Sequence, residues 1–256
     1  MNKQTRRYKA LIFWAVIILY LVFSYGSFGK ETEQKVVSGI EVRTVVDSDK
    51  SLISPDDITR KVRQFYPGID TMQLRSVELD QLEHFLAGQP AIKRVDAYKT
   101  YAGKVMVEVE QRTPILRIIK SGRNAYLDES GKLMPFSGNY TPHVPVATGF
   151  IPLPDDFADT SKYSIVLTGL FELSNFLREN PVWEAQIEQI YVDRKQEFYL
   201  IPRVGRHHIL LGEIDDYETK FKKLEALYTQ AFRETGWNTY RLINLKYKNQ
   251  VVCTKY

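Results

Sequence analysis

The chain has 256 residues, 44 % hydrophobic and 26 % charged, with a formal net charge of +4 at pH 7 and a sequence pI of about 8.9. The excess charge is local, because residues 1–9 carry four bases and no acid, and the remaining 31 Lys and Arg equal the 31 Asp and Glu in number. This balance excludes a nucleic-acid-binding role for residues 10–256, and the single cysteine, Cys253, excludes an internal disulfide.

The first predicted element is an apolar helix at 10–29, a stretch without any charged side chain. At about 1.5 Å per helical residue it is long enough to cross a hydrocarbon core of about 30 Å. Basic residues precede this stretch more densely than they follow it, so we predict a cytoplasmic tail at 1–9, a transmembrane helix at 10–29, a linker at 30–35 and an extracytoplasmic remainder. A cleaved signal peptide is the alternative, but its apolar core would be shorter.

Residues 36–114 are predicted to form a compact α+β domain in the order strand, helix, helix, strand, strand. The first strand is expected at 36–46. The first helix has a strong start signal, with Ser54 as N-cap, Pro55 at the first helical position and Asp57 closing a capping box.

A second helix and a hairpin complete this domain. Leu79, Leu82 and Leu86 recur at helical spacing before a break at Gly88-Gln89-Pro90. Strict alternation follows at 92–101 and 104–111 around a turn at Ala102-Gly103. The alternation predicts one buried and one exposed face, with Met106 on the exposed face. The residues predicted to be buried are Leu79, Leu82, Leu86, Val105, Val107 and Val109.

Residues 115–256 are predicted to form a mostly β domain with flanking helices, because short apolar runs alternate with turn sequences. Longer apolar patterns predict helices at 162–177 and 217–232, and a proline-rich connector is expected at 142–154. The predicted strands are 115–120, 125–127, 132–134, 187–192, 198–202, 209–211 and 240–255, the last interrupted by a turn at 248–250.

Candidate metal ligands and nucleophiles are few. His84 is expected to be partly buried in a helix, and His143 lies in the proline-rich connector. His207 and His208 alternate faces in a strand, so at most one of them can join a metal site. Cys253 alternates with apolar residues, which favours packing over catalysis, and no nucleophile or phosphate-loop motif occurs in the sequence.

Paired carboxylates could serve glycoside hydrolysis, but each acidic pair has a local structural explanation. All four pairs lie at predicted helix starts or in loops, where acidic side chains cap backbone N–H groups. The pairs are Asp56-Asp57, Asp128-Glu129, Asp155-Asp156 and Asp215-Asp216. We therefore predict that the protein is not an enzyme and binds no metal or cofactor.

Five short segments share their order and spacing with one known family: Pro90–Val95, Val105–Pro114, Tyr126–Gly131, Val144–Gly149 and Ile243–Tyr247. In these segments the chain resembles the bacterial FtsQ/DivIB cell-division family, although Gln111 replaces a Glu that is common there. The resemblance implies a POTRA-like domain at 36–114 and an FtsQ-type β domain at 115–256.

The resemblance also implies a function. It implies a non-catalytic bitopic scaffold of the bacterial divisome, in the inner membrane at the division septum. The implied partners are small bitopic coiled-coil proteins of the FtsB/DivIC and FtsL types. Two alternatives stay open, a POTRA-type secretion or outer-membrane assembly factor and an anchored cell-wall enzyme, the second of which would need a polar cleft near His207.

The resemblance assigns partner binding to the carboxy-terminal strands. A terminal strand at a sheet edge exposes unpaired N–H and C=O groups that an extended partner segment can complete. An ordinary core strand is the alternative for the same residues. Carried over by position, the predicted partner-binding residues are Leu245, Tyr247, Val251, Val252, Cys253, Lys255 and Tyr256.

Overall fold

The computed structural model describes residues 13–20, 22, 35–45, 51–157 and 159–256. The predicted tail at 1–9, most of the linker at 30–35 and much of the apolar segment at 10–29 lie outside these residues, whereas 13–20 are helical. Within the described ranges, no helix is both long and apolar enough to cross a membrane. The chain divides into two compact units, one ending at Gln111 and one beginning at Arg112.

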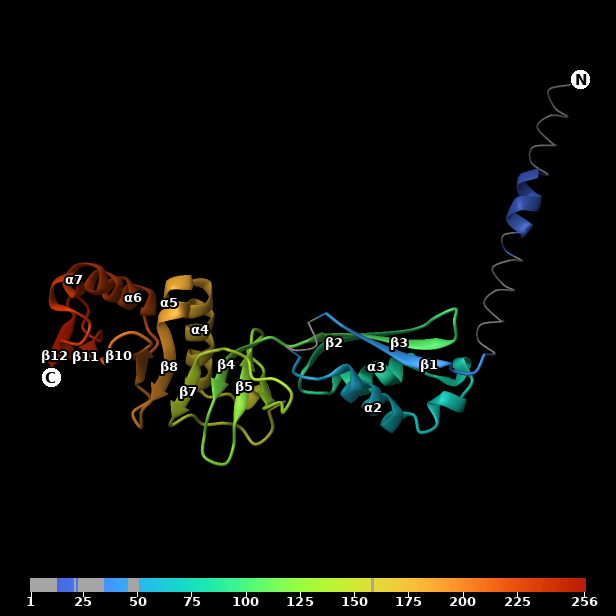
Figure 1. Cartoon of the computed structure of the whole chain (residues 1–256), viewed down its shortest axis with the longest axis horizontal. Helices are drawn as coiled ribbons and strands as arrows, with labels where there is room; N and C mark the ends of the chain where they lie inside the picture. Colours follow the sequence, from blue (N-terminus) through green and yellow to red (C-terminus); the bar gives the residue numbers. More distant parts are fainter. Residues whose placement is uncertain (1–12, 21, 23–34, 46–50, 158) are drawn as a thin grey trace, which may run out of the picture. The chain divides into compact units, whose positions relative to one another are not determined.

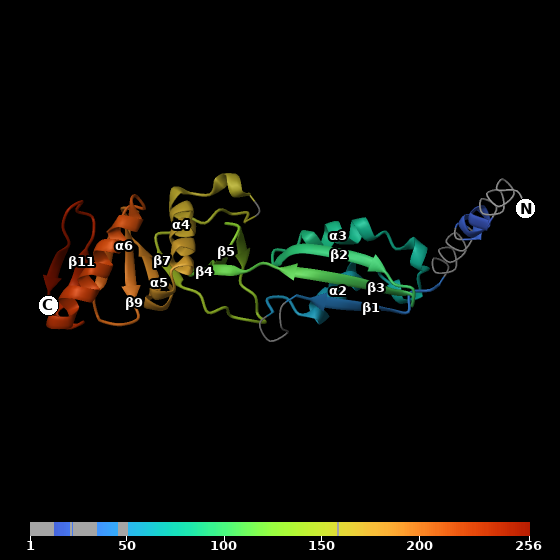
Figure 2. The ribbon, with the colours of Figure 1, turned by 90° about the horizontal axis from the view of Figure 1, so that it is seen from above.

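The first unit has the predicted order of strand, helix, helix, strand, strand, with two helices on one face of a small sheet (Figure 1). The central strand β3 is parallel to β1 on one side and antiparallel to β2 on the other. Figure 2 shows the same three strands from above. The elements are β1 (Gly39–Thr44), α2 (Pro55–Phe65), η2 (Ile69–Thr71), η3 (Leu74–Ser76), α3 (Leu79–Ala87), β2 (Ile92–Lys99) and β3 (Lys104–Gln111).

The start of α2 confirms the predicted capping box. The Ser54 hydroxyl accepts a hydrogen bond from the Asp57 N–H at 3.1 Å, and the Asp57 carboxylate accepts one from the Ser54 N–H at 3.2 Å. Ile58 and Val62, four residues apart on one face of the helix, are completely buried. The cap thus sets where the helix begins, and the apolar stripe directs it onto the sheet.

The exposed position predicted for Met106 is wrong. Val105, Val107 and Val109 are completely buried as predicted, but Met106 on the opposite face is only 3 % exposed. Its partners in the ladder are Glu41 in β1 and Tyr98 in β2. Because β3 is the middle strand, Met106 has a neighbour with a long side chain on each side, and these neighbours cover it. Alternation in the sequence does not show whether a strand is central or at an edge.

Gln111 ends β3 and ties it to the segment that precedes α2. Its side-chain oxygen accepts hydrogen bonds from the N–H groups of Leu52 at 2.8 Å and Ile53 at 3.3 Å. Its side-chain nitrogen donates to the Ile53 carbonyl at 2.9 Å and to the Ser51 hydroxyl. Gln111 is buried, and the amide is used both as donor and as acceptor.

We expect Gln111→Glu to lower the free energy of unfolding by about 1–3 kcal/mol, because a buried carboxylate cannot donate to Ile53 and Ser51. Urea unfolding of the full chain, followed by circular dichroism, measures the change. Gln64→Glu, on the exposed side of α2, is the matched control and should leave stability nearly unchanged. Equal stability of Gln111→Glu and wild type would contradict the role assigned to the amide.

The second unit contains a single nine-stranded mixed sheet among its described residues. The strand order is β12-β11-β10-β9-β8-β7-β4-β5-β6, so β12 and β6 form the two edges. The strands are β4 (Pro114–Ile118), β5 (Ala125–Asp128), β6 (Leu133–Pro135), β7 (Val146–Gly149), β8 (Ile187–Val192), β9 (Phe198–Pro202), β10 (His208–Gly212), β11 (Tyr240–Asn244) and β12 (Val252–Lys255). The helical segments are η4 (Thr160–Lys162), α4 (Ile165–Glu179), α5 (Pro181–Gln186), α6 (Tyr217–Ala226), η5 (Leu227–Ala231) and α7 (Phe232–Thr235).

The core of this unit lies between the sheet and its helices. Leu170 of α4, Trp183 of α5 and Phe221 of α6 belong to the same buried cluster as Ile190 of β8 and Leu200 of β9. Alternate residues of the strands therefore face the helices, and the intervening residues lie on the other face of the sheet. The antiparallel run β8-β9-β10 confirms the predicted meander.

Three segments differ from the sequence-based prediction. The proline-rich connector contains a strand, β7, which pairs in parallel with both β4 and β8 near the middle of the sheet. A short helix, α5, follows α4 directly, beginning at Pro181. The helix predicted at 217–232 is interrupted by a π-helical turn at Leu227–Ala231. Some of these features depend on contacts between distant segments, and the π-helical turn depends on a local change of helical period. The spacing of apolar residues in the sequence indicates neither.

Candidate protein-binding edge

The predicted terminal strand is a hairpin whose second strand forms one edge of the sheet. β11 is parallel to β10, and β12 folds back antiparallel onto β11, with Ile243 opposite Cys253. Among the described strands, none pairs with the other side of β12. In an antiparallel pair, alternate residues turn their N–H and C=O groups away from the partner, so β12 presents backbone donors and acceptors outward.

Three side chains, with four contacts between them, hold this hairpin in place. The Lys223 ammonium of α6 donates to the Leu245 carbonyl at 3.2 Å and to the Tyr247 carbonyl at 2.7 Å. The Lys246 side chain forms an ion pair with Glu197, and the Tyr256 hydroxyl donates to the Arg206 carbonyl at 2.9 Å. The edge is therefore attached at its turn and at its end, which lowers the conformational cost of adding a partner strand.

The predicted partner-binding residues fall into two groups. Leu245 is completely buried and precedes the turn, and Val251 and Cys253 are partly buried against the core. Burial also raises the pKa of the Cys253 thiol, which lowers its thiolate fraction and argues against a nucleophilic role. The exposed residues are Tyr247, Val252, Lys255 and Tyr256, with Val252 39 % and Tyr256 71 % exposed.

The opposite edge of the sheet is less suited to strand addition. β6 has only three residues and ends at Pro135, which has no N–H group to donate. β12 has four residues and no proline. Of the two edges of the described sheet, β12 is thus the better template for an incoming strand.

Sequence reasoning missed the role of Lys223. It lies more than twenty residues before the turn that it holds, and a basic residue on an amphipathic helix is usually solvated. The Lys246–Glu197 pair was missed because its two residues lie 49 positions apart in the sequence. Its hydrogen bond raises the pKa of Lys246, so the ammonium is retained at neutral pH.

The histidines form no metal site among the described residues, where no group of three potential ligands occurs. His207 is completely buried and precedes β10, and its Nε2 lies 2.7 Å from the Tyr228 hydroxyl within a group of aromatic rings. Burial lowers the pKa of His207 and raises the pKa of Tyr228, so both groups are neutral at pH 7. His208 and His143 are exposed, and His84 is exposed rather than partly buried as predicted.

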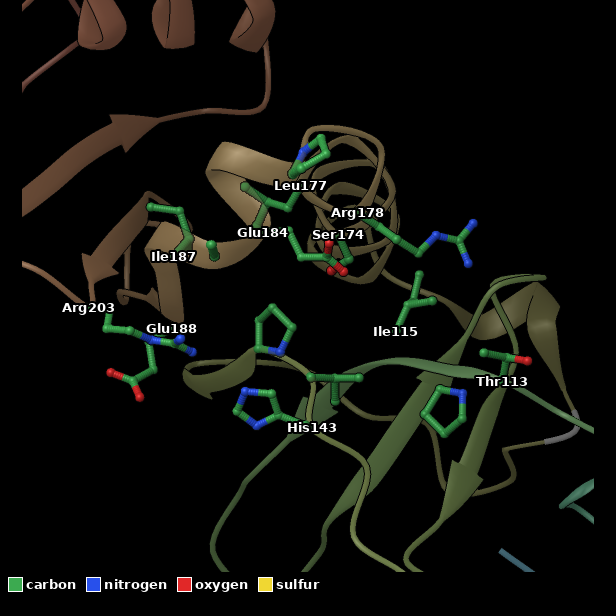
Figure 3. Close-up of a pocket in the computed structure, with 15 residues that line it drawn as sticks. Thr113, Ile115, His143, Ser174, Leu177, Arg178, Glu184, Ile187, Glu188 and Arg203 are labelled. Carbon is green, nitrogen blue, oxygen red and sulfur yellow. The ribbon is translucent and has the colours of Figure 1, made fainter. Parts of the chain in front are cut away.

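A pocket of about 460 Å³ lies between the α4–α5 helices and the strands beside them. Figure 3 shows the labelled side chains of these helices above the pocket and His143 below it. Its charged residues have both signs, with Arg178 and Arg203 against Glu184 and Glu188. This balance does not indicate one class of ligand, so β12 remains the stronger candidate site.

The fold is that of a two-unit α+β protein, in which a small three-stranded unit precedes a unit built on one mixed sheet with β12 at an edge. Residues 35–110 match the model of the POTRA-like domain, and residues 113–254 match the model described as FtsQ/DivIB, C-terminal related. The chain therefore belongs to the FtsQ/DivIB family of cell-division proteins.

A curated relative supports this assignment. The cell division protein FtsQ of Rhodothermus marinus (strain ATCC 43812 / DSM 4252 / R-10) is 28 % identical over 180 residues. The match covers 65 % of this chain and 62 % of the relative. The chain thus spans less than two thirds of the length of that protein.

Proposed function

We propose that the protein is a non-catalytic scaffold of the bacterial divisome, which binds other division proteins by strand addition at β12. The observation that carries this proposal is the open edge of the sheet, held by Lys223 and Tyr256. Main-chain hydrogen bonds to such an edge supply affinity, and alternate side chains supply specificity. Membership of the FtsQ/DivIB family supports a role in cell division.

The proposal includes a place in the cell and a class of partner. The charge-free segment 10–29 would anchor the chain in the inner membrane at the division septum, with residues 1–9 in the cytoplasm. The partners would be small bitopic coiled-coil proteins of the FtsB/DivIC and FtsL types. Confinement to one membrane raises the effective concentration of both proteins, so a short pairing strand is sufficient for association.

Val252→Asp tests the edge directly, because Val252 is exposed on β12 and its replacement leaves the core intact. Co-purification of FtsB/DivIC-type and FtsL-type proteins with the tagged full chain from solubilised membranes measures binding. We expect Val252→Asp to reduce the recovered partner at least about tenfold, since a charge placed in an interface core is poorly tolerated.

Val182→Asp is the matched control, with the same substitution at an exposed position of α5 outside the edge. It should recover partners as wild type does, while a chain that ends at Gln250 should recover none. Unchanged recovery by Val252→Asp, with the fold intact by circular dichroism, would reject strand addition at this edge.

A further inference from the structure

A second exposed surface of the second unit lies away from β12, where three neighbouring parallel strands end. β4, β7 and β8 run in the same direction, with Ile118 paired to Ala147 and Gly149 paired to Val192 (Figure 1). Parallel strands deliver the residues that follow them to the same edge of a sheet, where open sheets commonly bind ligands. The residues delivered here are Ile119, Phe150 and Arg194.

These residues line a pocket of about 620 Å³. This volume is within the range of sites that hold ligands. Two of its residues are large and apolar yet unusually exposed, Ile119 at 40 % and Phe150 at 49 %. The other lining residues are Lys120, Ser121, Gly149, Ile151, Pro152, Arg194 and Gln196.

The charge of this pocket has one sign. Lys120 and Arg194 line it, and no acidic side chain does so among the described residues. Of the acidic groups nearby, the Asp193 carboxylate accepts hydrogen bonds from the N–H groups of Lys195 and Glu197, and Glu197 forms an ion pair with Lys246. Neither Lys120 nor Arg194 forms an ion pair with a carboxylate among the described residues, so both cations can pair with an incoming anionic group.

The pocket is also built from ordered parts. The Arg194 guanidinium lies over the Phe150 ring, 5.0 Å from its centroid, and the turn that carries Arg194 is closed by Asp193. The Phe150 N–H donates to the Val192 carbonyl at 2.8 Å, which fixes the backbone between the two side chains. The Phe150 ring can contact an apolar side chain of a ligand, and the adjacent Arg194 guanidinium can pair with a carboxylate beside that side chain.

We propose that this pocket binds an acidic peptide segment in which an aromatic or aliphatic side chain is flanked by carboxylates. The apolar side chain would contact Phe150 and Ile119, and the carboxylates would pair with Arg194 and Lys120. Anionic lipid is a poorer match, because surfaces that bind it usually gather about four to eight bases. The pocket is separate from the β12 edge, so this proposal does not depend on strand addition.

Fluorescence anisotropy of the full chain with a labelled Glu-Glu-Phe-Glu-Glu peptide tests the proposal. Arg194→Glu is expected to weaken binding at least about tenfold, because it places like charges together. Phe150→Ser should weaken it as well, through loss of apolar contact. Binding should also weaken as the salt concentration rises.

Arg233→Glu, at an exposed position of α7, is the matched charge control. All the variants keep the basic tail at 1–9. A difference in peptide affinity between Arg233→Glu and Arg194→Glu is therefore due to the pocket. Val252→Asp should bind the peptide as wild type does, which separates this site from the edge. The proposal would be overturned if Arg194→Glu and Arg233→Glu bound the acidic peptide equally. It would also be overturned if the wild-type chain bound a Lys-Lys-Phe-Lys-Lys peptide as tightly as the acidic one. A lipid site would replace the proposal under one outcome. In that outcome the wild-type chain binds phosphatidylglycerol vesicles but not the peptide, and Arg194→Glu abolishes the vesicle binding.

Discussion

Replacing Gly149 with alanine is expected to lower the free energy of unfolding of the second unit by about 2–5 kcal/mol, the sum of a left-handed backbone cost and a steric overlap. Gly149 has φ +100°, and a Cβ there would lie 2.1 Å from the Val192 carbonyl oxygen and 2.9 Å from a Tyr191 ring carbon. The backbone has little freedom to move away, because β7 is paired on both sides, with β4 and with β8.

Gly122→Ala separates the two contributions. Gly122 also has positive φ, +78°, but a Cβ there would meet no atom within 4 Å. Its replacement should cost only the left-handed backbone term, about 1–2 kcal/mol. Urea unfolding of the full chain, followed by tryptophan fluorescence, to which the buried Trp183 contributes, measures both variants. Equal losses in the two variants would show that the close approach at Gly149 does not contribute.

Replacing Asp128 with alanine is expected to lower the free energy of unfolding by about 3–5 kcal/mol, the usual effect of removing one member of a buried ion pair. Asp128 is 1 % exposed at the end of β5. One carboxylate oxygen accepts hydrogen bonds from the Ser130 N–H, the Ser130 hydroxyl and the Lys132 N–H, at 2.7–2.9 Å. The other oxygen accepts one from the Arg112 guanidinium at 2.9 Å.

Asp155→Ala is the matched control for this substitution. Asp155 also pairs with an arginine, Arg123 at 3.2 Å, but its side chain is fully exposed. Exposed ion pairs contribute little, so this variant should unfold with nearly the same midpoint as wild type. A stability of Asp128→Ala close to that of Asp155→Ala would contradict the assigned role of the buried carboxylate in closing the β5–β6 turn.

Local signals in the sequence predicted local structure well. The Ser54 cap, Pro55 and Asp57 placed the start of α2 correctly, because a capping box involves residues only three positions apart. The hairpin of β2 and β3 followed from alternation around a glycine turn. A turn after Asp128 was correctly expected, but Asp128 itself is the last residue of β5. Its burial and its pairing with Arg112 were not expected, because that pairing joins residues sixteen positions apart.

The sequence by itself determined the α+β character of the chain, the helix and strand signals of both units, and the segments that resemble the FtsQ/DivIB family. Only the tertiary structure decided which strands are central and which lie at an edge. β7 lies in the middle of the sheet, Leu245 is in the core, and β12 is left unpaired on one side among the described strands. The physical reason is that strand order depends on hydrogen bonds between distant segments, whereas apolar periodicity reports only the face on which a side chain lies.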